Sequence, residues 1–225
     1  MHYVIGDIHG HLPRLASILK QIKPSETDTI YFLGDVIDRN PDGLNILSCI
    51  MEMPNAKMIL GNHEYMMLQA LTTDNPILYD ANLDLWYSNG GDVTHKAWEL
   101  WTDDQQEEML KYLKALPLNL EISVNGYDYL LVHGAPALWY NPVTSRYKSQ
   151  AEFAVWQRIS LQDTAPNGKI VIFGHTPTQM YQYEVPPKIW THEDFIGIDC
   201  GCAFEEGRLA CVRLEDMQVY YSKSD

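Results

Sequence analysis

Five short apolar runs along the chain have the character of β-strands, and each is followed at once by a polar motif. The runs are Tyr3–Ile5, Ile30–Leu33, Met58–Leu60, Leu130–Val132 and Ile170–Phe173. Apolar runs of this length, bounded by polar residues, are typical of β-strands. Ligands of α/β sheets gather outside the carboxyl ends of the strands. We therefore expect the five polar motifs to meet at one place.

Helical spacing follows each of the first three strands. Apolar residues recur every three or four positions from Leu12 to Ile22, which predicts a helix. Asn40-Pro41 has the pattern of a helix cap followed by proline at the first helical position, before the apolar residues that start at Leu44. A third helix is expected over His63–Leu71. The first seventy residues thus repeat a strand–motif–helix unit.

The spacing of equivalent polar residues supports this repeat. Asp7, Asp35 and Asn62 are 28 and 27 positions apart. That separation is about the length of one βαβ unit, whose two strands lie parallel in the same sheet. We therefore expect the first three strands to be parallel neighbours.

The rest of the chain departs from the repeat. We interpret residues 73–117 as a helical insertion beside the site, in which Thr102-x-x-Gln105 resembles a capping box. Asn125-Gly126 predicts a hairpin turn in the strand-rich remainder. The expected strands there are Leu118–Val124, Tyr127–His133, Lys169–Gly174, Phe195–Cys200, Arg208–Leu214 and Gln218–Tyr221. We expect one domain over residues 1–225.

Composition excludes several classes of protein. A hydrophobic content of 46% in 225 residues provides ample core, so disorder is excluded. A net charge of −14 argues against extended nucleic-acid binding, which needs a basic face. The chain starts without the features of a signal peptide, and no apolar run approaches the ~20 residues of a membrane helix. The cysteines lack zinc or disulfide spacing. We expect a cytoplasmic protein without a membrane partner, with Cys200 and Cys202 alternating along a buried strand.

The polar motifs supply six side chains suited to divalent cations. They are Asp7, His9, Asp35, Asn62, His133 and His175. Each has an ordinary explanation when taken alone, because an isolated Asp-x-His is more often a capped turn and a lone histidine near a strand end is usually a core residue. Their coincidence at five strand ends instead indicates a two-metal site for phosphoester chemistry. His2, His11, His95 and His192 lack this placement and are expected at the surface or in loops.

With these residues in view, the chain resembles the phosphoprotein phosphatases of the calcineurin-like metallophosphoesterase superfamily, and in particular the compact bacterial and phage-lambda-type serine/threonine phosphatases. The matching motifs are Gly6–Gly10, Gly34–Arg39, Gly61–Glu64, His133-Gly134 and Gly174–Pro177. The resemblance implies an α/β fold in which two packed mixed β-sheets are flanked by helices as an α/β/β/α sandwich. Asn40 departs from the glycine that is usual after the arginine.

The resemblance also implies a metal assignment. Asp7 and His9 would bind the first ion, and Asp35 would bridge both ions. Asn62, His133 and His175 would hold the second. The two divalent ions are expected to be manganese, although iron, zinc and magnesium suit the same mixture of oxygen and nitrogen ligands.

Roles in catalysis follow from the same resemblance. A metal-activated water would attack phosphorus in line with the leaving group. Arg39 and Arg158 would hold the phosphate oxygens, since paired guanidinium groups fit this geometry. His63, oriented by Asp38, would protonate the departing oxygen. The expected substrate is a phosphorylated protein or a small phosphoester.

Two other functions stay open at this stage. Relatives with the same metal motifs hydrolyse dinucleoside polyphosphates of the diadenosine tetraphosphate type. Glu64 favours the protein phosphatase, because those hydrolases more often carry aspartate there. A non-catalytic module that binds phosphorylated partners is a further hypothesis, and the full set of ligands, His63 and both arginines argue against it. The sequence leaves the oligomeric state open.

Overall fold

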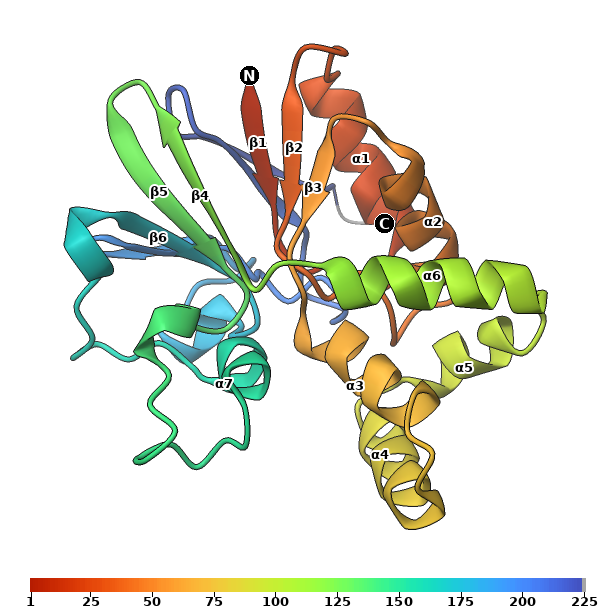
Figure 1. Ribbon diagram of the computed structural model, residues 1–225. Helices are drawn as coiled ribbons and strands as arrows, with labels where there is room; N and C mark the ends of the chain where they lie inside the picture. The colour runs from red at the N-terminus through yellow and green to blue at the C-terminus, as the bar shows by residue number, and fades with distance from the viewer. Residues whose placement is uncertain (224–225) are drawn as a thin grey trace.

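The first of two sheets carries the repeated units that the sequence predicts. The computed structural model describes residues 1–223, and Figure 1 shows the two sheets facing each other with helices outside the first. In spatial order the first sheet contains β10 (Gln218–Tyr221), β9 (Ala210–Arg213), β1 (His2–Ile5), β2 (Thr29–Phe32) and β3 (Ala56–Met58). β1 pairs with β2 and β2 with β3 in parallel, while β9 is antiparallel to both of its neighbours. The predicted parallel neighbours are therefore confirmed.

The second sheet is also mixed. Its spatial order is β4 (Asn119–Val124), β5 (Tyr127–Val132), β6 (Ile170–Phe173), β8 (Phe195–Gly197) and β7 (Trp190–His192). β4 and β5 form the expected hairpin around Asn125-Gly126. β5, β6 and β8 are parallel, and β7 is antiparallel to β8. The carboxyl end of β5 lies beside those of β1, β2 and β3 in the middle of the molecule (Figure 1).

Helices occupy the ends and outer faces of the sheets. They are α1 (Leu12–Ile22), α2 (Gly43–Glu52), α3 (Asn62–Leu71), α4 (Pro76–Ser88), α5 (Asp92–Trp98), α6 (Asp103–Ala115) and α7 (Gln150–Trp156), with 3-10 turns η1 (Ala137–Trp139), η2 (Pro166–Gly168) and η3 (Thr178–Met180). The segment 73–117 holds α4, α5 and α6, and the capping box of Thr102 and Gln105 is present. None of the helices in residues 1–223 is long and apolar enough to cross a membrane.

Alternate side chains of each central strand enter two different parts of the core. In β2, Ile30 and Phe32 pack with Leu47 of α2 in the layer between sheet and helices. Tyr31 lies instead in the core between the sheets, together with Leu131 of β5. Because successive side chains of a strand point to opposite faces, burial on both sides requires an unbroken apolar run. The α/β class and the arrangement of two packed mixed sheets expected from the sequence are confirmed.

The predicted start of the second helix is wrong. α2 begins at Gly43 after Asp42, and neither Asn40 nor Pro41 belongs to it. The Asn40 side chain donates its amide hydrogen to the backbone oxygen of His9 at 2.9 Å instead. Asn40 therefore joins two loops of the site. This contact explains why an asparagine lies here although no helix begins at it.

Three further local predictions are corrected. The strand expected over Phe195–Cys200 ends at Gly197, so Cys200 and Cys202 are buried in turns and do not alternate along a strand. His192 belongs to β7, a strand of three residues that is too short to produce a detectable alternation. His95 is buried within α5 and does not lie at the surface.

Candidate active site

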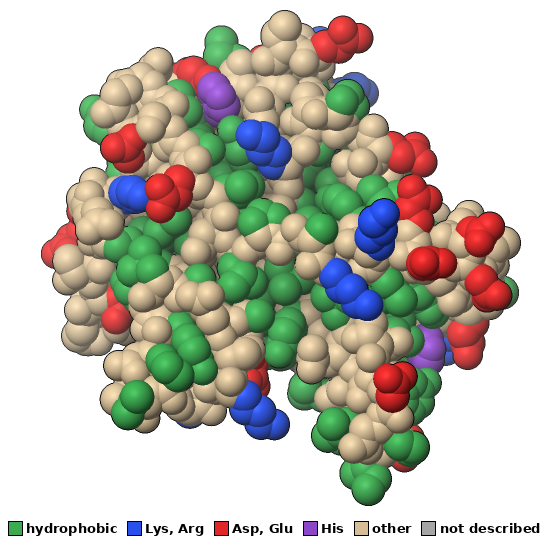
Figure 2. Space-filling view, viewed as in Figure 1, with side chains coloured by type: hydrophobic (Ala, Val, Ile, Leu, Met, Phe, Trp, Pro, Cys, Tyr) green, Lys and Arg blue, Asp and Glu red, His purple; other side chains and the backbone are tan. Residues whose placement is uncertain are grey.

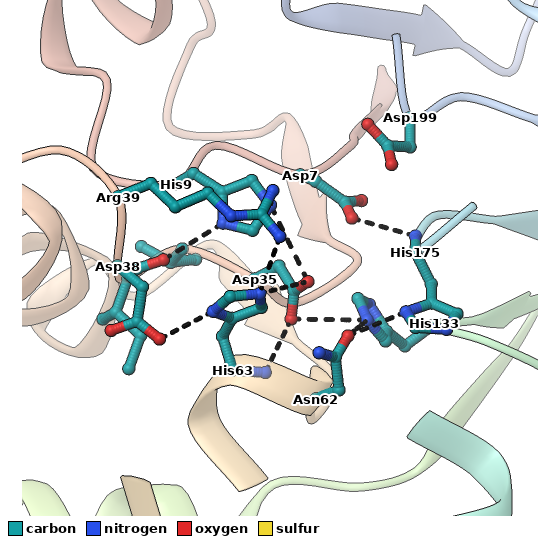
Figure 3. Close-up of polar contacts among 12 residues, drawn as sticks. Asp7, His9, Asp35, Asp38, Arg39, Asn62, His63, His133, His175 and Asp199 are labelled. Atoms are coloured by element: carbon teal, nitrogen blue, oxygen red, sulfur yellow. Dashed lines mark hydrogen bonds and ion pairs between the residues drawn. The ribbon is translucent and has the colours of Figure 1, made fainter. Parts of the chain in front are cut away.

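The structure brings the six proposed ligands together at the carboxyl ends of strands from both sheets. Figure 3 shows their side chains turned toward a common centre around Asp35. Their positions are Asp7 and His9 after β1, Asp35 after β2, Asn62 at the start of α3, His133 after β5 and His175 after β6. All are buried except His175, which is half-buried. The two sheets therefore supply one polar cluster inside the protein.

Strained backbone is concentrated in this cluster. Several of its residues that are not glycine adopt a positive φ, between 50° and 73°. They are His9, Asp35, Asp38, Arg39 and His175. Such conformations cost roughly 1–3 kcal/mol each and persist where the surrounding contacts enforce them. Their gathering at one place marks a functional site.

Glu64 holds the loop that presents Asp35. Its buried carboxylate accepts hydrogen bonds from the backbone N–H groups of Asp35 and Val36, both at 2.8 Å. Burial and the charge of Asp35 raise the pKa of Glu64 to about 7. Gly61 is required beside this contact, because a Cβ there would lie 2.3 Å from the Asp35 nitrogen. Glu64 thereby holds the strained loop in one conformation.

Three histidines direct one ring nitrogen toward the centre and fasten the other to a backbone carbonyl. His9 Nδ1 lies 3.2 Å from the oxygen of Ile37, and His133 Nδ1 lies 2.7 Å from that of Leu33. His175 Nε2 lies 3.2 Å from the oxygen of Trp156. A carbonyl only accepts, so the outer nitrogen of each ring carries a proton, and in a neutral ring the inner nitrogen presents its lone pair. Histidines that bind metals are oriented in this way.

His63 differs from these three histidines in its outer partner. Its Nδ1 lies 2.6 Å from Oδ2 of Asp38, so a buried carboxylate holds this ring in place of a carbonyl. Its backbone N–H donates to Oδ1 of Asp35 at 3.0 Å. A carboxylate partner fixes the orientation of the imidazole and leaves its Nε2 toward the centre. This arrangement suits a group that transfers protons.

Buried carboxylates make the centre electron-rich. Burial raises the pKa of Asp7 well above its usual range, and the charge of nearby Asp199 raises it further. Burial also raises the pKa of Asp199 to about 6. Burial opposes ionisation of Asp35 too, but the charges of His133 and His63 outweigh it and hold the pKa of Asp35 well below its usual value. Ionised Asp35 is thus the negative centre of the cluster.

The inner nitrogens of His133 and His175 face oxygen atoms. His133 Nε2 lies 2.9 Å from Oδ1 of Asn62 and 3.3 Å from Oδ1 of Asp35. Burial lowers the pKa of His133, but the charge of Asp35 more than offsets it and the pKa reaches about 10. His175 Nδ1 lies 2.8 Å from the same oxygen of Asn62, and burial lowers the pKa of His175 to about 3. The neutral ring of His175 therefore faces an oxygen with its lone pair, and a cation would reconcile these two atoms, whereas the raised pKa of His133 lets its Nε2 donate to the oxygens it faces.

The donor atoms fit divalent cations for this reason. Two groups of possible ligands share Asp35, one with His9 and His63 and the other with His133 and His175. The ligand atoms within each group lie within 4.8 Å of one another. Asp7 belongs to neither group, but its Oδ1 is buried without a hydrogen-bond partner while its Oδ2 accepts from the backbone N–H of His175 at 2.9 Å. Asp7 therefore has an oxygen available for an ion.

The two arginines differ in their placement. Arg39 brings Nη1 to 3.0 Å from His9 Nε2 and Nη2 to 3.2 Å from His63 Nε2, so its guanidinium lies within the cluster. Arg158 is exposed and contacts the sulfur of Met180 at 2.6 Å. Its positive charge is still close enough to contribute to the lowered pKa of His175, after burial and the charge of His133. The face of the molecule in Figure 2 carries many acidic side chains, several of them over α6.

Sequence reasoning missed some residues of the site. Asp199 follows β8 as the other acids follow their strands, so the same strand-end rule applied to β8 would have found it. Trp86 donates its indole N–H to Asp38, and Thr94 accepts from the Asp38 backbone. No local pattern indicates these two contacts, because they join segments about fifty positions apart.

The fold and this cluster define a metallophosphoesterase. A family model for calcineurin-like phosphoesterases matches residues 3–209, and the chain belongs to this family. The resemblance inferred from the five motifs is confirmed.

Individual relatives carry two different names. The "Serine/threonine-protein phosphatase 2" of Salmonella typhimurium (strain LT2) is 29% identical over 222 residues, covering 95% of this chain and 92% of that protein. A "Bis(5'-nucleosyl)-tetraphosphatase, symmetrical" of Acidovorax ebreus is 29% identical over 161 residues, covering 69% of this chain and 52% of that protein. A crystal structure provisionally described as a diadenosine tetraphosphatase superposes with a TM-score of 0.66 at 17% identity, covering 100% of this chain and 93% of that chain.

Proposed function

We propose that this chain is a metal-dependent phosphomonoesterase and, within that class, a serine/threonine protein phosphatase. The reaction consumes one water and converts a phosphate monoester to an alcohol and inorganic phosphate. The observation that carries the proposal is the buried pair of His63 and Asp38, 2.6 Å apart, within the cluster whose two groups of possible cation ligands share Asp35. A module that only bound phosphate would have no use for a proton-transfer pair.

The cation ligands proposed from the sequence are retained. Asp7, His9, Asp35, Asn62, His133 and His175 would hold two divalent cations, with Asp35 between them. Such a pair supplies Lewis-acid stabilisation of charge on phosphorus and makes water nucleophilic near neutral pH. Manganese is the ion we expect, because imidazole, amide and carboxylate ligands together suit it.

His63 would deliver a proton to the leaving oxygen. Its Nδ1 is engaged by Asp38, so Nε2 is the nitrogen that faces the site. Arg39 Nη2 lies 3.2 Å from that Nε2, and a guanidinium can only donate. Phosphate binding by Arg39 would withdraw this donor and leave Nε2 free to carry the proton. Serine and threonine alkoxides are poor leaving groups, so this step matters most for protein substrates.

Arg39 and Arg158 would bind the phosphate from two sides. Arg39 is fixed against His9 and His63, whereas Arg158 is exposed after α7. Guanidinium groups hold phosphate oxygens with paired hydrogen bonds and oppose the charge that develops on them. They would also offset the acidic surface for an anionic substrate.

The free cysteines at 49, 200, 202 and 211 agree with a reducing cytoplasm as the location.

One observation favours dinucleoside polyphosphate hydrolysis as the second candidate. Phe204 is 52% exposed, and its ring centre lies 5.8 Å from Cζ of Arg39. An exposed aromatic ring beside a phosphate-binding arginine could stack on a nucleobase. Hydrolysis of diadenosine tetraphosphate would then break a P–O–P bond of its polyphosphate. The leaving phosphate of that reaction needs little protonation.

A product assay separates the two functions. Protein loaded with Mn²⁺ is incubated with a phosphoserine peptide and, separately, with diadenosine tetraphosphate. We expect inorganic phosphate and a serine peptide at a higher kcat/KM than any nucleotide product. Release of ADP from diadenosine tetraphosphate at the higher kcat/KM would replace the protein phosphatase with the hydrolase. Failure on both substrates and on 4-nitrophenyl phosphate would overturn the enzyme proposal.

A further inference from the structure

We propose that Trp86 of α4 and Thr94 of α5 are positioning residues that hold Asp38 and, through it, the proton donor His63. The inference rests on the proposed function, because it concerns the same proton transfer. It assigns a part in the chemistry to the segment 73–117, which otherwise lies beside the site as three helices.

The indole of Trp86 shares one oxygen of Asp38 with the imidazole of His63. Trp86 is fully buried, and its Nε1–H donates to Oδ2 of Asp38 at 2.8 Å. The same oxygen lies 2.6 Å from Nδ1 of His63. An indole nitrogen can only donate, so Oδ2 accepts from Trp86. With Asp38 as a carboxylate, the same oxygen also accepts from His63 Nδ1, and His63 Nε2 is then the nitrogen left for substrate.

The carboxylate of Asp38 depends on these contacts for its direction. Its other oxygen, Oδ1, is buried without a hydrogen-bond partner in residues 1–223. Without Trp86, Asp38 would keep His63 as its one side-chain partner and could rotate about its own Cβ–Cγ bond. Such a rotation would swing the hydrogen bond that orients the imidazole.

The backbone of Asp38 is fixed from the same segment. Thr94 Oγ1 accepts a hydrogen bond from the Asp38 N–H at 3.0 Å. The oxygen of Gly90, in the turn between α4 and α5, accepts from the N–H of Arg39 at 2.9 Å. Asp38 and Arg39 have φ values of 73° and 69°, a left-handed conformation that side chains rarely adopt. The turn after α4 therefore enforces the strained backbone from which both residues act.

Close packing keeps the indole in place. A Cβ on Gly91 would lie 2.2 Å from Cδ1 of Trp86, so the ring rests directly against this turn. The ring of His95 lies 5.5 Å away, and His95 Nδ1 is hydrogen-bonded to the hydroxyl of Tyr87 at 2.5 Å. This contact explains why His95 is buried although the sequence predicts a surface residue. Neighbouring side chains from α4 and α5 thus clamp the Trp86 donor.

The test compares Trp86→Phe with Trp98→Phe. Phenylalanine keeps most of the aromatic volume but removes the N–H, and Trp98 is a buried tryptophan of α5 with no hydrogen bond to Asp38. We measure kcat and KM with Mn²⁺ for a phosphoserine peptide and for 4-nitrophenyl phosphate, together with bound manganese and Tm. Trp86→Phe should lower kcat on the peptide by about 10–100-fold, the usual effect of losing an orienting partner. Its kcat on the aryl ester should change by a few-fold at most, because that leaving group needs little protonation.

A second pair of variants tests the backbone contact. Thr94→Val removes the acceptor for the Asp38 N–H and should show the same selective loss on the peptide, while Thr94→Ser keeps the hydroxyl and should restore the rate. Equal losses on both substrates in Trp86→Phe, or an effect of Trp98→Phe of the same size and selectivity, would show that the tryptophan is merely structural. Either result overturns the inference.

A spectroscopic readout keeps this inference separate from the proposed function. A proton held between His63 Nδ1 and Asp38 gives a far-downfield ¹H resonance, which needs no turnover. It should be present in the wild type and in Trp98→Phe, and weakened or shifted in Trp86→Phe. If the wild type hydrolyses no phosphoester, the proposed function fails, and this resonance alone decides the positioning. An unchanged resonance in Trp86→Phe overturns it.

Discussion

The first sheet contributes to the site through three successive strand–loop–helix units, whereas the second contributes single residues after separate strands. Asp7, Asp35 and Asn62 belong to the first-sheet half, which also contains His9 and the His63–Asp38 pair. His133, His175, Asp199 and Arg158 form the second-sheet half. The first half combines ligands with proton transfer, and the second supplies ligands and an exposed arginine. Asn62 Oδ1 joins the halves, since it faces both His133 and His175.

The halves also differ in how they are held. Side chains from distant helices fix the first half, with Glu64 under the Asp35 loop and Trp86 on Asp38. Backbone carbonyls fix the histidines of the second half, as one also fixes His9 in the first. We infer that changes in the first half abolish chemistry or its selectivity for the leaving group, while changes in the second mainly weaken cation binding.

The largest effect is expected at Asp35. Both halves of the site share this residue as a proposed ligand, so the difference between them should disappear when it is changed. Asp35→Asn removes the negative centre shared by the two ligand groups. Metal content and activity should fall together, with kcat/KM lower by ~10⁴ or more, since metal catalysis supplies several kcal/mol. Elemental analysis and an aryl phosphate assay measure both. Asp84→Asn, an exposed change on α4, is the control, and full metal content in Asp35→Asn would contradict the assignment.

The next effect separates proton transfer from metal binding within the first half. His63→Asn should retain manganese but lower kcat on a phosphoserine peptide by roughly 10²–10⁴, the usual contribution of a general acid. Aryl phosphates should lose much less. Steady-state kinetics on both substrates provide the ratio, with His192→Asn in β7 as the matched histidine control. An equal loss on both substrates would remove His63 from the role of acid.

A smaller effect is expected in the second half at Gly174. A Cβ there would lie 2.2 Å from Oδ1 of Asp7, the buried oxygen without a partner. Gly174→Ala should weaken Mn²⁺ binding by about 10–100-fold and leave activity largely recoverable at saturating manganese. Calorimetric titration measures the affinity. Gly168→Ala, where the new methyl group would meet open space, should leave the affinity unchanged, although its φ of 68° makes alanine cost some stability there. Unaltered affinity in Gly174→Ala would place Asp7 outside the cation site.

The smallest effect concerns Asp28, which lies directly before β2, at the end of that strand away from the site. Hydrogen bonds from the N-terminal ammonium group and from Ser25 lower the pKa of Asp28 to about 2. Because the folded pKa lies below the usual value of 3.8, this stabilisation is present above about pH 4 and is lost as pH falls through 2. Asp28→Asn should lower Tm by roughly a few °C near neutral pH and by less near pH 2. Thermal unfolding at both pH values tests this, and an equal deficit at both would contradict it.

Much of the first-sheet half follows from sequence because its information is local. Asp7, Asp35 and Asn62 recur at the spacing of a βαβ unit, and each lies directly after an apolar run. The strand-end rule also brought His133 and His175 to the same place. The structure places all of these side chains together, while their roles as ligands stay predictions.

Other contacts could not be inferred because packing decides them. Nothing near Trp86 in the sequence indicates that its N–H reaches Asp38, since the contact depends on how α4 and α5 fold back onto the site. The hydrogen bond from the Asn40 side chain to the His9 backbone depends likewise on the approach of two loops. β7 is a three-residue edge strand that exists because β8 pairs with it. The strand-end rule could have identified Asp199, but the strand expected from the sequence extends to Cys200, whereas β8 ends at Gly197.

A crystal structure of the protein grown with Mn²⁺, with anomalous scattering recorded at the manganese edge, tests the central claim most directly. We predict two anomalous peaks about 3.5–4 Å apart, with Asp35 between them, His9 on one and His133 and His175 on the other. A single peak, two peaks without Asp35 between them, or no peak within the cluster would contradict the claim that both sheets build one two-cation centre.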